Sequence, residues 1–159
     1  MSIRTVFLAL TMSTAATFAF AHGRTPEATL VELFCAQHGS DQHGYGYLVT
    51  ASLLELIDKA QAKNDEIQAA APDEKPPLGD GILFQSYPDM APVCKQGAFG
   101  ADGIVEVQYE FPETPDANWT DRLKLVTESG LVKIDDVLYG KEGVEGLRKV
   151  LDGVLKAAQ

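Results

Sequence analysis

The chain has 159 residues, of which 23 are Asp or Glu and only 13 are Lys or Arg, so its formal net charge is −10. Binding to a nucleic-acid backbone requires clustered Lys and Arg side chains, so we expect no nucleic-acid partner. The negative charge is typical of a chain kept in solution by self-repulsion, and alternatively it indicates a basic partner.

Residues 1–21 have the pattern of a secretory signal peptide. Arg4 gives a positive start, an apolar run follows from Val6 to Phe20, and Ala19-Phe20-Ala21 has the form of a cleavage site. The run is shorter than the ~20 apolar residues of a membrane span and contains Thr and Ser. We therefore expect a periplasmic or secreted protein with no membrane span after cleavage. Residues 22–159 then form a single domain.

The two cysteines, Cys35 and Cys94, both lie in the predicted mature chain. In an oxidising compartment an even pair usually forms one disulfide bond, and the alternative is two buried thiols. Their spacing differs from that of a CxxC redox motif. We expect a structural disulfide.

The first half of the mature chain is predicted to be helical. Thr25-Pro26-Glu27 is typical of a helix start, and the apolar spacing that follows predicts a helix ending near Gly39. After a turn-rich segment, 39–46, a second helix is expected within 50–71, with capping-box spacing from Ser52 to Glu55. Residues 78–92 are then predicted to form a long ordered loop with a short strand at 82–85.

The second half of the chain alternates between apolar and polar residues. This period predicts strands at 93–99, 105–111, 119–126 and 131–139, and a helical stripe follows Gly143. Because helices and strands are segregated, we predict an α+β fold. Its N-terminal helices would pack on a curved antiparallel sheet that is followed by a C-terminal helix.

Four segments carry a family resemblance: ATLVELF at 28–34, YLVTASLLELI at 47–57, GDGILFQ at 79–85 and LVKIDDVLY at 131–139. Together they resemble a bacterial family of exported domains with a nuclear-transport-factor-2-like (cystatin-like) cone fold and no assigned function. The resemblance implies one cone-fold domain. Members often carry an acid directly after the Gln, where this chain has Ser86. The wider fold hosts both enzymes and binding modules.

Two carboxylates are candidates for catalysis. Strict alternation places Asp136 with Ile134 and Leu138 on an apolar face, and it places Asp121 with Leu123. The resemblance implies that an acid inside the cone can act as a general base. The alternative is a structural Asp that accepts hydrogen bonds from backbone amides or an arginine.

One segment is a candidate metal site. His38, Asp41 and His43 place two imidazoles and a carboxylate within six residues, and metal ions such as Zn²⁺ bind such nitrogen and oxygen donors. The alternative interpretation is a polar surface loop.

Aromatic residues beside Gly and Pro are enriched at recognition sites. Those predicted to bind a ligand or partner, together with the neighbouring amide, are Tyr45, Tyr47, Phe84, Gln85 and Tyr87. We expect Trp119 to lie in the core.

No nucleophile elbow, phosphate loop, dinucleotide fingerprint or zinc signature occurs, so we expect no cofactor. The leading hypothesis is a non-enzymatic exported module that binds a protein or small ligand through the cone mouth and the 78–92 loop. One alternative is a periplasmic immunity protein against a secreted toxin. The other is a cone-fold enzyme that uses an interior Asp.

Overall fold

The computed structural model describes residues 24–38, 42–79, 84–140 and 145–157. The predicted signal peptide, 1–21, lies outside the described residues. The described part confirms the α+β class, with three α-helices and a five-stranded antiparallel sheet. None of the helices in these ranges combines the length and the apolar composition that crossing a bilayer requires.

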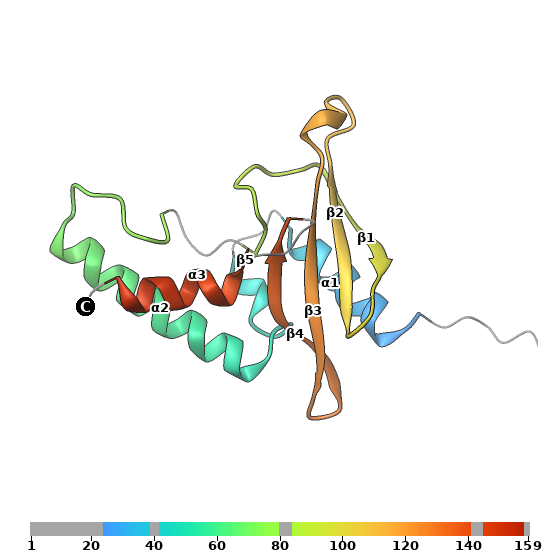
Figure 1. Ribbon diagram of the computed structural model, residues 1–159, viewed down its shortest axis with the longest axis horizontal. Coiled ribbons are helices and arrows are strands. Elements are labelled where there is room, and N and C mark those ends of the chain that lie inside the picture. Colours follow the sequence, from blue (N-terminus) through green and yellow to red (C-terminus); the bar gives the residue numbers. More distant parts are fainter. Residues whose placement is uncertain (1–23, 39–41, 80–83, 141–144, 158–159) are drawn as a thin grey trace, which may run out of the picture.

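The sheet is a simple meander in which each strand pairs with the next along the chain (Figure 1). Its strands are β1 (Val93–Phe99), β2 (Ile104–Glu110), β3 (Trp119–Glu128), β4 (Leu131–Tyr139) and β5 (Glu145–Gly146). All four pairs are antiparallel. A short 3₁₀ helix, η2 (Pro115–Ala117), lies in the turn between β2 and β3. Of the strand predicted at 82–85, only residues 84 and 85 are described, and they form bends.

In the described residues, three α-helices lie beside the sheet. Helix α1 (Pro26–Gln37) lies across one face, whereas α2 (Ala51–Ala70) and α3 (Leu147–Lys156) pack together and extend beyond the sheet on the β4 side (Figure 1). As predicted, Thr25 caps α1. The expected capping box at Ser52 is wrong, because Thr50 caps α2 by accepting a hydrogen bond from the Leu53 amide.

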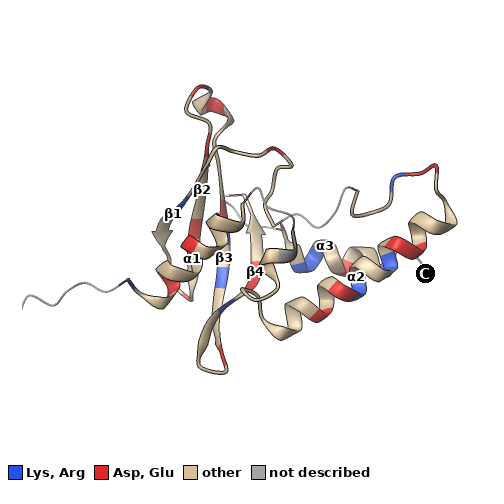
Figure 2. Cartoon of the chain, turned by 180° about the vertical axis from the view of Figure 1, so that it is seen from behind, with Lys and Arg blue, Asp and Glu red and all other residues tan. Residues whose placement is uncertain are grey.

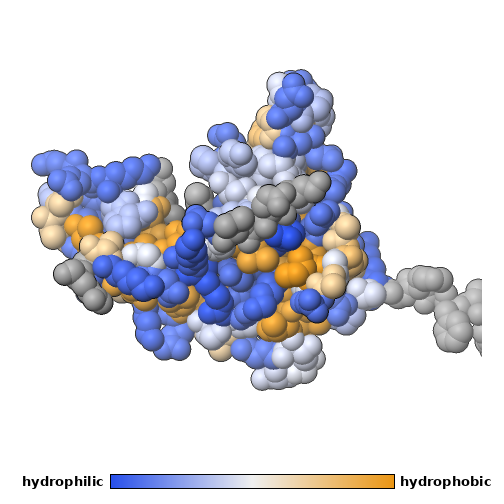
Figure 3. Space-filling view, viewed as in Figure 1, coloured by the Kyte–Doolittle hydropathy of each residue, from blue (hydrophilic) through white to orange (hydrophobic). Residues whose placement is uncertain are grey.

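The core lies between α1 and the covered face of the sheet, and it continues between α2 and α3. The sheet contributes Val105, Val107, Tyr109, Leu123, Leu125, Ile134 and Val137, and the helices contribute Leu30, Val31, Phe34, Leu53, Ala60, Leu147, Leu151 and Val154. On the face seen in Figure 3, hydrophobic residues gather over the sheet and along the paired helices, and the turn that projects above β2 and β3 is mainly hydrophilic.

A β-bulge in β4 overturns one of the sequence predictions. Lys124 pairs with Asp136 but the next residue, Leu125, pairs with Ile134, so Asp135 is an extra residue on β4. The bulge lets Ile134 and Val137 both face the core. Asp136 therefore lies on the opposite face from Ile134, and its predicted place on the apolar face is wrong. A bulge reverses the alternation of the residues that follow it, and the apolar–polar pattern of the sequence does not predict where a bulge occurs.

The predicted disulfide is confirmed. Cys35 in α1 is bonded to Cys94 in β1, with 5.3 Å between their Cα atoms. The bond ties the first helix to the edge strand of the sheet across a sequence separation of 59 residues.

Replacing both cysteines with Ser tests how much this disulfide stabilises the fold. On the chain-entropy model a loop of 59 residues makes the bond worth about 4 kcal/mol. We expect the double variant to lose about that much free energy of unfolding in urea titrations. Wild-type protein in strong reductant is the control and should match it. A variant as stable as the oxidised wild type would contradict the prediction.

Candidate functional site

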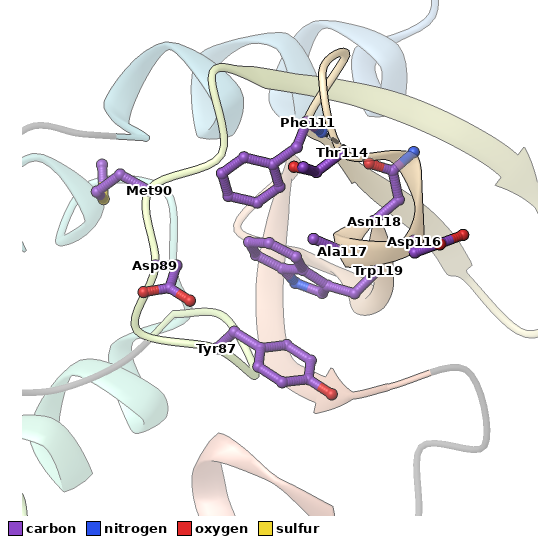
Figure 4. A pocket seen from close by; sticks show the side chains of 9 residues that line it. All are labelled: Tyr87, Asp89, Met90, Phe111, Thr114, Asp116, Ala117, Asn118 and Trp119. Carbon is purple, nitrogen blue, oxygen red and sulfur yellow. Dashed lines mark hydrogen bonds between the residues drawn. The ribbon is translucent and has the colours of Figure 1, made fainter.

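A groove of about 560 Å³ lies between the 84–91 loop and the 111–118 turn (Figure 4). We call it the Trp119 groove. Its lining residues are Tyr87, Asp89, Met90, Phe111, Thr114, Asp116, Ala117, Asn118 and Trp119. It therefore combines aromatic and apolar surface with two carboxylates.

The turn that forms one wall is built by Pro, Asn and a 3₁₀ helix. The Asn118 carboxamide oxygen accepts a hydrogen bond of 2.7 Å from the Phe111 amide, which closes the turn between β2 and β3. Pro115 starts η2 with its fixed φ angle. This closure holds Phe111 and Trp119 on neighbouring strand ends, so both rings reach the same groove.

Trp119 is the centre of an aromatic cluster. Its ring stacks on the buried Tyr109, with centroids 4.6 Å apart and planes 15° apart. Phe111 and Tyr87 meet the same indole at centroid distances of 6.0 and 5.3 Å in tilted geometries. Burial raises the pKa of Tyr109 far above its usual value, and the nearby Asp121 carboxylate raises it further. Tyr109 therefore stays a neutral support beneath the indole. Trp119, which was expected in the core, is half-buried: it packs against the core and also lines the groove.

The buried Asp121 carboxylate holds this cluster in place. Asp121 is 0% exposed, and it accepts four hydrogen bonds. Ser86 donates from its amide at 2.8 Å and from its hydroxyl at 2.6 Å. The Trp119 indole donates at 3.2 Å and the Gly140 amide at 2.8 Å. In the described part of the chain, no Lys or Arg forms an ion pair with it.

The 84–91 loop that forms the other wall is shaped by its own side chains. Gln85 is buried, and its amide nitrogen donates to the Tyr87 carbonyl at 2.6 Å and to the Asp89 carbonyl at 3.0 Å. Phe84 stacks on Tyr45 with ring centroids 4.2 Å apart, and both rings are buried. Gln85, Phe84 and Tyr45 therefore support the groove without lining it. Of the predicted binding residues, Tyr87 does line it.

The charge around the groove has one sign. Asp89 and Asp116 lie exposed on its two walls. No Lys or Arg occurs from residue 76 to 94 or from 96 to 121, and the second of these stretches holds six acidic residues. In the cartoon of Figure 2, the red Asp and Glu positions of the loop and of the turn mark this acidic region. Together with the Asp121 carboxylate at the edge of the indole, these acids give the groove a negative potential.

Tyr47, the remaining predicted binding residue, belongs to a different surface. It is 54% exposed, as is Tyr87, but its hydroxyl accepts a hydrogen bond of 3.1 Å from Gln37. It lines a hollow of about 400 Å³ with residues that include Leu33 and Leu131. The structure does not bring Tyr47 together with the Trp119 groove.

The predicted metal site is described only in part. His38 donates to the Ala91 carbonyl at 3.0 Å, and its ring packs against Tyr109 with centroids 5.1 Å apart. Asp41 and the side chain of His43 lie outside the described residues, so their joint site stays a prediction. Within the residues that are described, no three His, Cys, Asp or Glu side chains are grouped to hold a metal ion.

Asp136 serves the start of α3. Its Oδ1 accepts hydrogen bonds from the Val137 amide at 2.8 Å and the Arg148 amide at 3.0 Å, at a helix whose cap residue, Gly146, has no side chain. A Cβ at Gly146 would lie 2.9 Å from Asp136 Oδ2 and 3.0 Å from the Val137 carbonyl oxygen, so a larger residue there would displace the Asp136 carboxylate. Burial raises the pKa of Asp136, and the backbone hydrogen bonds partly oppose that rise. Asp136 and Asp121 lie on opposite faces of the sheet and form no dyad.

The Arg148 side chain completes this junction between α3 and β4. Its guanidinium donates to the Asp135 carboxylate at 2.6 Å, the Asp135 carbonyl at 2.6 Å and the Ser52 hydroxyl at 2.8 Å. Lys124 reaches the same carboxylate at 3.2 Å. Although burial alone would raise it, the pKa of Asp135 is lowered by its hydrogen bonds to Lys124 and Arg148. The bulged acidic pair thus anchors the paired helices to the sheet.

Sequence reasoning missed most of the groove. Asp89, Met90, Phe111, Asp116 and Asn118 were not singled out. One usable signal was present, because both walls come from Pro-containing stretches with aromatic residues, acids and no Lys or Arg. Composition could therefore have paired the two segments as candidates.

Comparison of this chain with models of known protein families, with curated proteins and with solved structures finds no match. No function is carried over from another protein. The argument for function therefore rests on the geometry of the groove and on its charge.

The Asp121→Asn variant tests the role of the buried carboxylate. An amide oxygen can accept from at most part of the four donors, so at least one buried N–H or O–H group loses its partner, at about 1–3 kcal/mol each. We expect a loss of about 2–5 kcal/mol in unfolding free energy and a red-shifted Trp119 emission. Asp102→Asn, in the exposed β1–β2 turn, is the matched control. Wild-type stability in Asp121→Asn would contradict the assignment.

Asp136 is tested by its pH dependence. Asn keeps an oxygen acceptor for the two backbone amides, whereas Ala removes it at about 1 kcal/mol. Because burial raises the pKa of Asp136, the folded state disfavours the ionised form. Asp136→Asn should therefore be at least as stable as wild type at neutral pH. The difference should vanish as the pH falls through that pKa and the wild-type carboxyl is protonated.

Denaturant titrations at neutral and mildly acidic pH measure this difference. An Asn variant as unstable as the Ala variant at neutral pH would show that the charge itself is needed. A general base at Asp136 would instead appear as loss of an activity in a variant of unchanged stability.

Proposed function

We propose that this chain is an exported, non-enzymatic binding module that holds a basic protein partner in the Trp119 groove. The observation that carries the proposal is an open aromatic groove whose charged lining residues, Asp89 and Asp116, are both acids. Aromatic side chains supply much of the energy of protein interfaces, and complementary charge increases the rate of encounter. The net charge of the whole chain, −10, attracts the same class of partner.

Two observations support export. Residues 1–21 have the three regions of a secretory signal peptide, and cleavage after Ala21 would make His22 the first residue of the mature chain. The Cys35–Cys94 disulfide suits an oxidising compartment. The order of helices and strands is also compatible with the exported cone-fold domains that the sequence resembles, and we retain that kinship as part of the proposal.

A binding role is favoured over catalysis by the contacts of the buried Asp121 and the half-buried Asp136. Asp121 accepts hydrogen bonds from Ser86, Trp119 and Gly140, and Asp136 accepts them from the amides of Val137 and Arg148. These are the bonds of carboxylates that hold structure together. On the groove walls, Asp89 and Asp116 form no ion pair with another described residue, so both can meet another molecule.

A secreted toxin is one partner that fits this description. An acidic exported domain that covers a basic surface has the properties of a periplasmic immunity protein. Charge complementarity is the observation that favours this reading. The partner recovered in the experiment below decides between a toxin and another basic protein.

The test places a photo-cross-linking amino acid at Tyr87 in the full chain, expressed in the periplasm of its producing cells. The matched control places it at Tyr47, which is equally exposed, at 54%, on a different surface. We expect a cross-linked basic protein from position 87 only, with a yield that falls as ionic strength rises. Mass spectrometry identifies the partner and checks that the mature chain begins at His22.

Equal cross-linking from both positions, or none from position 87, would show that the groove is not the binding site. A yield that does not change with salt would remove the electrostatic part of the proposal.

A further inference from the structure

We infer that the Trp119 groove binds the guanidinium group of an arginine side chain presented by the basic partner. This inference rests on the proposed function and names the chemistry of the contact. It is drawn from the indole, the two free carboxylates and the shape of the groove.

The indole of Trp119 is arranged to attract a cation. Its Nε1–H donates to the Asp121 carboxylate at 3.2 Å, and this acceptor increases the electron density of the ring. Trp is the strongest cation–π partner among the side chains. Tyr109 stacks on the indole and fixes its plane. The buried Asp121 carboxylate lies at the Nε1 edge of the ring, where it also attracts a cation bound in the groove.

The walls supply carboxylates on two sides. Asp89 comes from the 84–91 loop and Asp116 from η2, and both line the groove. In Figure 4, Asp89 lies on the ring side of Trp119, whereas Asp116 projects from η2 on the other side of the Trp119 backbone. Neither forms an ion pair with any other described residue. A cation that enters the groove therefore meets acids without competing with a resident Lys or Arg.

Arginine fits this arrangement better than lysine. A guanidinium is planar, so it can stack on the indole while its edge donates to a carboxylate, whereas an ammonium is a compact point charge with strong hydration. The groove volume of about 560 Å³ also leaves room for the aliphatic stem. Met90 and Phe111 offer apolar surface to those methylene groups.

The geometry also favours a protein as the source of the arginine. Tyr87 and Met90 are both more than half exposed, so the groove opens to the surface and a protruding side chain can enter it. A neutral aromatic ligand would leave Asp89 and Asp116 unpaired, and an anion would be repelled. Free arginine would bring its own carboxylate into the same negative field.

The experiment uses three nine-residue peptides that differ only at three positions, which carry arginine, lysine or citrulline. Citrulline keeps the shape of arginine without its charge. Trp119 is the only tryptophan of the chain, so its fluorescence reports binding at the groove. With the intact, oxidised protein, we expect the arginine peptide to bind at least about 10-fold more tightly than the citrulline peptide and about 3-fold more tightly than the lysine peptide.

Two double variants distinguish direct contacts of Asp89 and Asp116 with the peptide from the effect of the protein's overall negative charge. Asp89→Asn with Asp116→Asn should weaken arginine-peptide binding by about 5-fold and leave the citrulline peptide unchanged. The control, Asp102→Asn with Asp152→Asn, removes the same charge from the β1–β2 turn and from α3. The control pair should change binding less than 2-fold, because exposed charges far from the groove are screened by salt.

Equal binding of the arginine and citrulline peptides would overturn the inference, and so would equal weakening by the control pair. If free L-arginine binds as tightly as the arginine peptide, the inference that the arginine belongs to a protein is wrong. If Tyr87 cross-links a partner but the peptides are not distinguished, the proposed function stands and only the arginine contact falls. If the Tyr87 cross-link also fails, the groove is not the binding site.

Discussion

One buried charge organises this structure. A carboxylate removed from water costs several kcal/mol unless donors surround it, and Asp121 has donors from Ser86, Trp119 and Gly140. These residues come from a loop, a strand end and the residue after β4. Burial of Asp121 without all of them would be unfavourable, so the carboxylate favours a single arrangement of the three segments.

The site follows from that arrangement. The 84–91 loop has no strand pairing of its own. It reaches the sheet through the hydrogen bonds of Ser86 to Asp121, and its Phe84 ring packs on Tyr45. With the loop in place, Tyr87 and Asp89 face the turn that carries Phe111 and Asp116. The acids divide between two roles. Asp121, Asp135 and Asp136 join elements of the fold, and Asp89 and Asp116 remain free to meet a partner.

Local pattern predicted much of the fold correctly because its causes are local. Period-two alternation marked the strands and placed Asp121 on the buried face of β3, and Thr25 with Pro26 marked the start of α1. The face of the sheet predicted for Asp136 was wrong for an equally definite reason. The extra residue at Asp135 reverses the alternation, and it is stabilised by Lys124 and by Arg148, a side chain of the following helix.

The sequence by itself determined the kinds of elements, their order and the cysteine pair. Each of these follows from hydrophobic period, turn chemistry or the count of a residue type. Tertiary structure alone decided that the 84–91 loop and the 111–118 turn form two walls of one groove, and that Trp119 lines it. Those contacts join residues more than twenty positions apart through Asp121. A local sequence pattern does not predict which distant residues donate hydrogen bonds to a buried carboxylate.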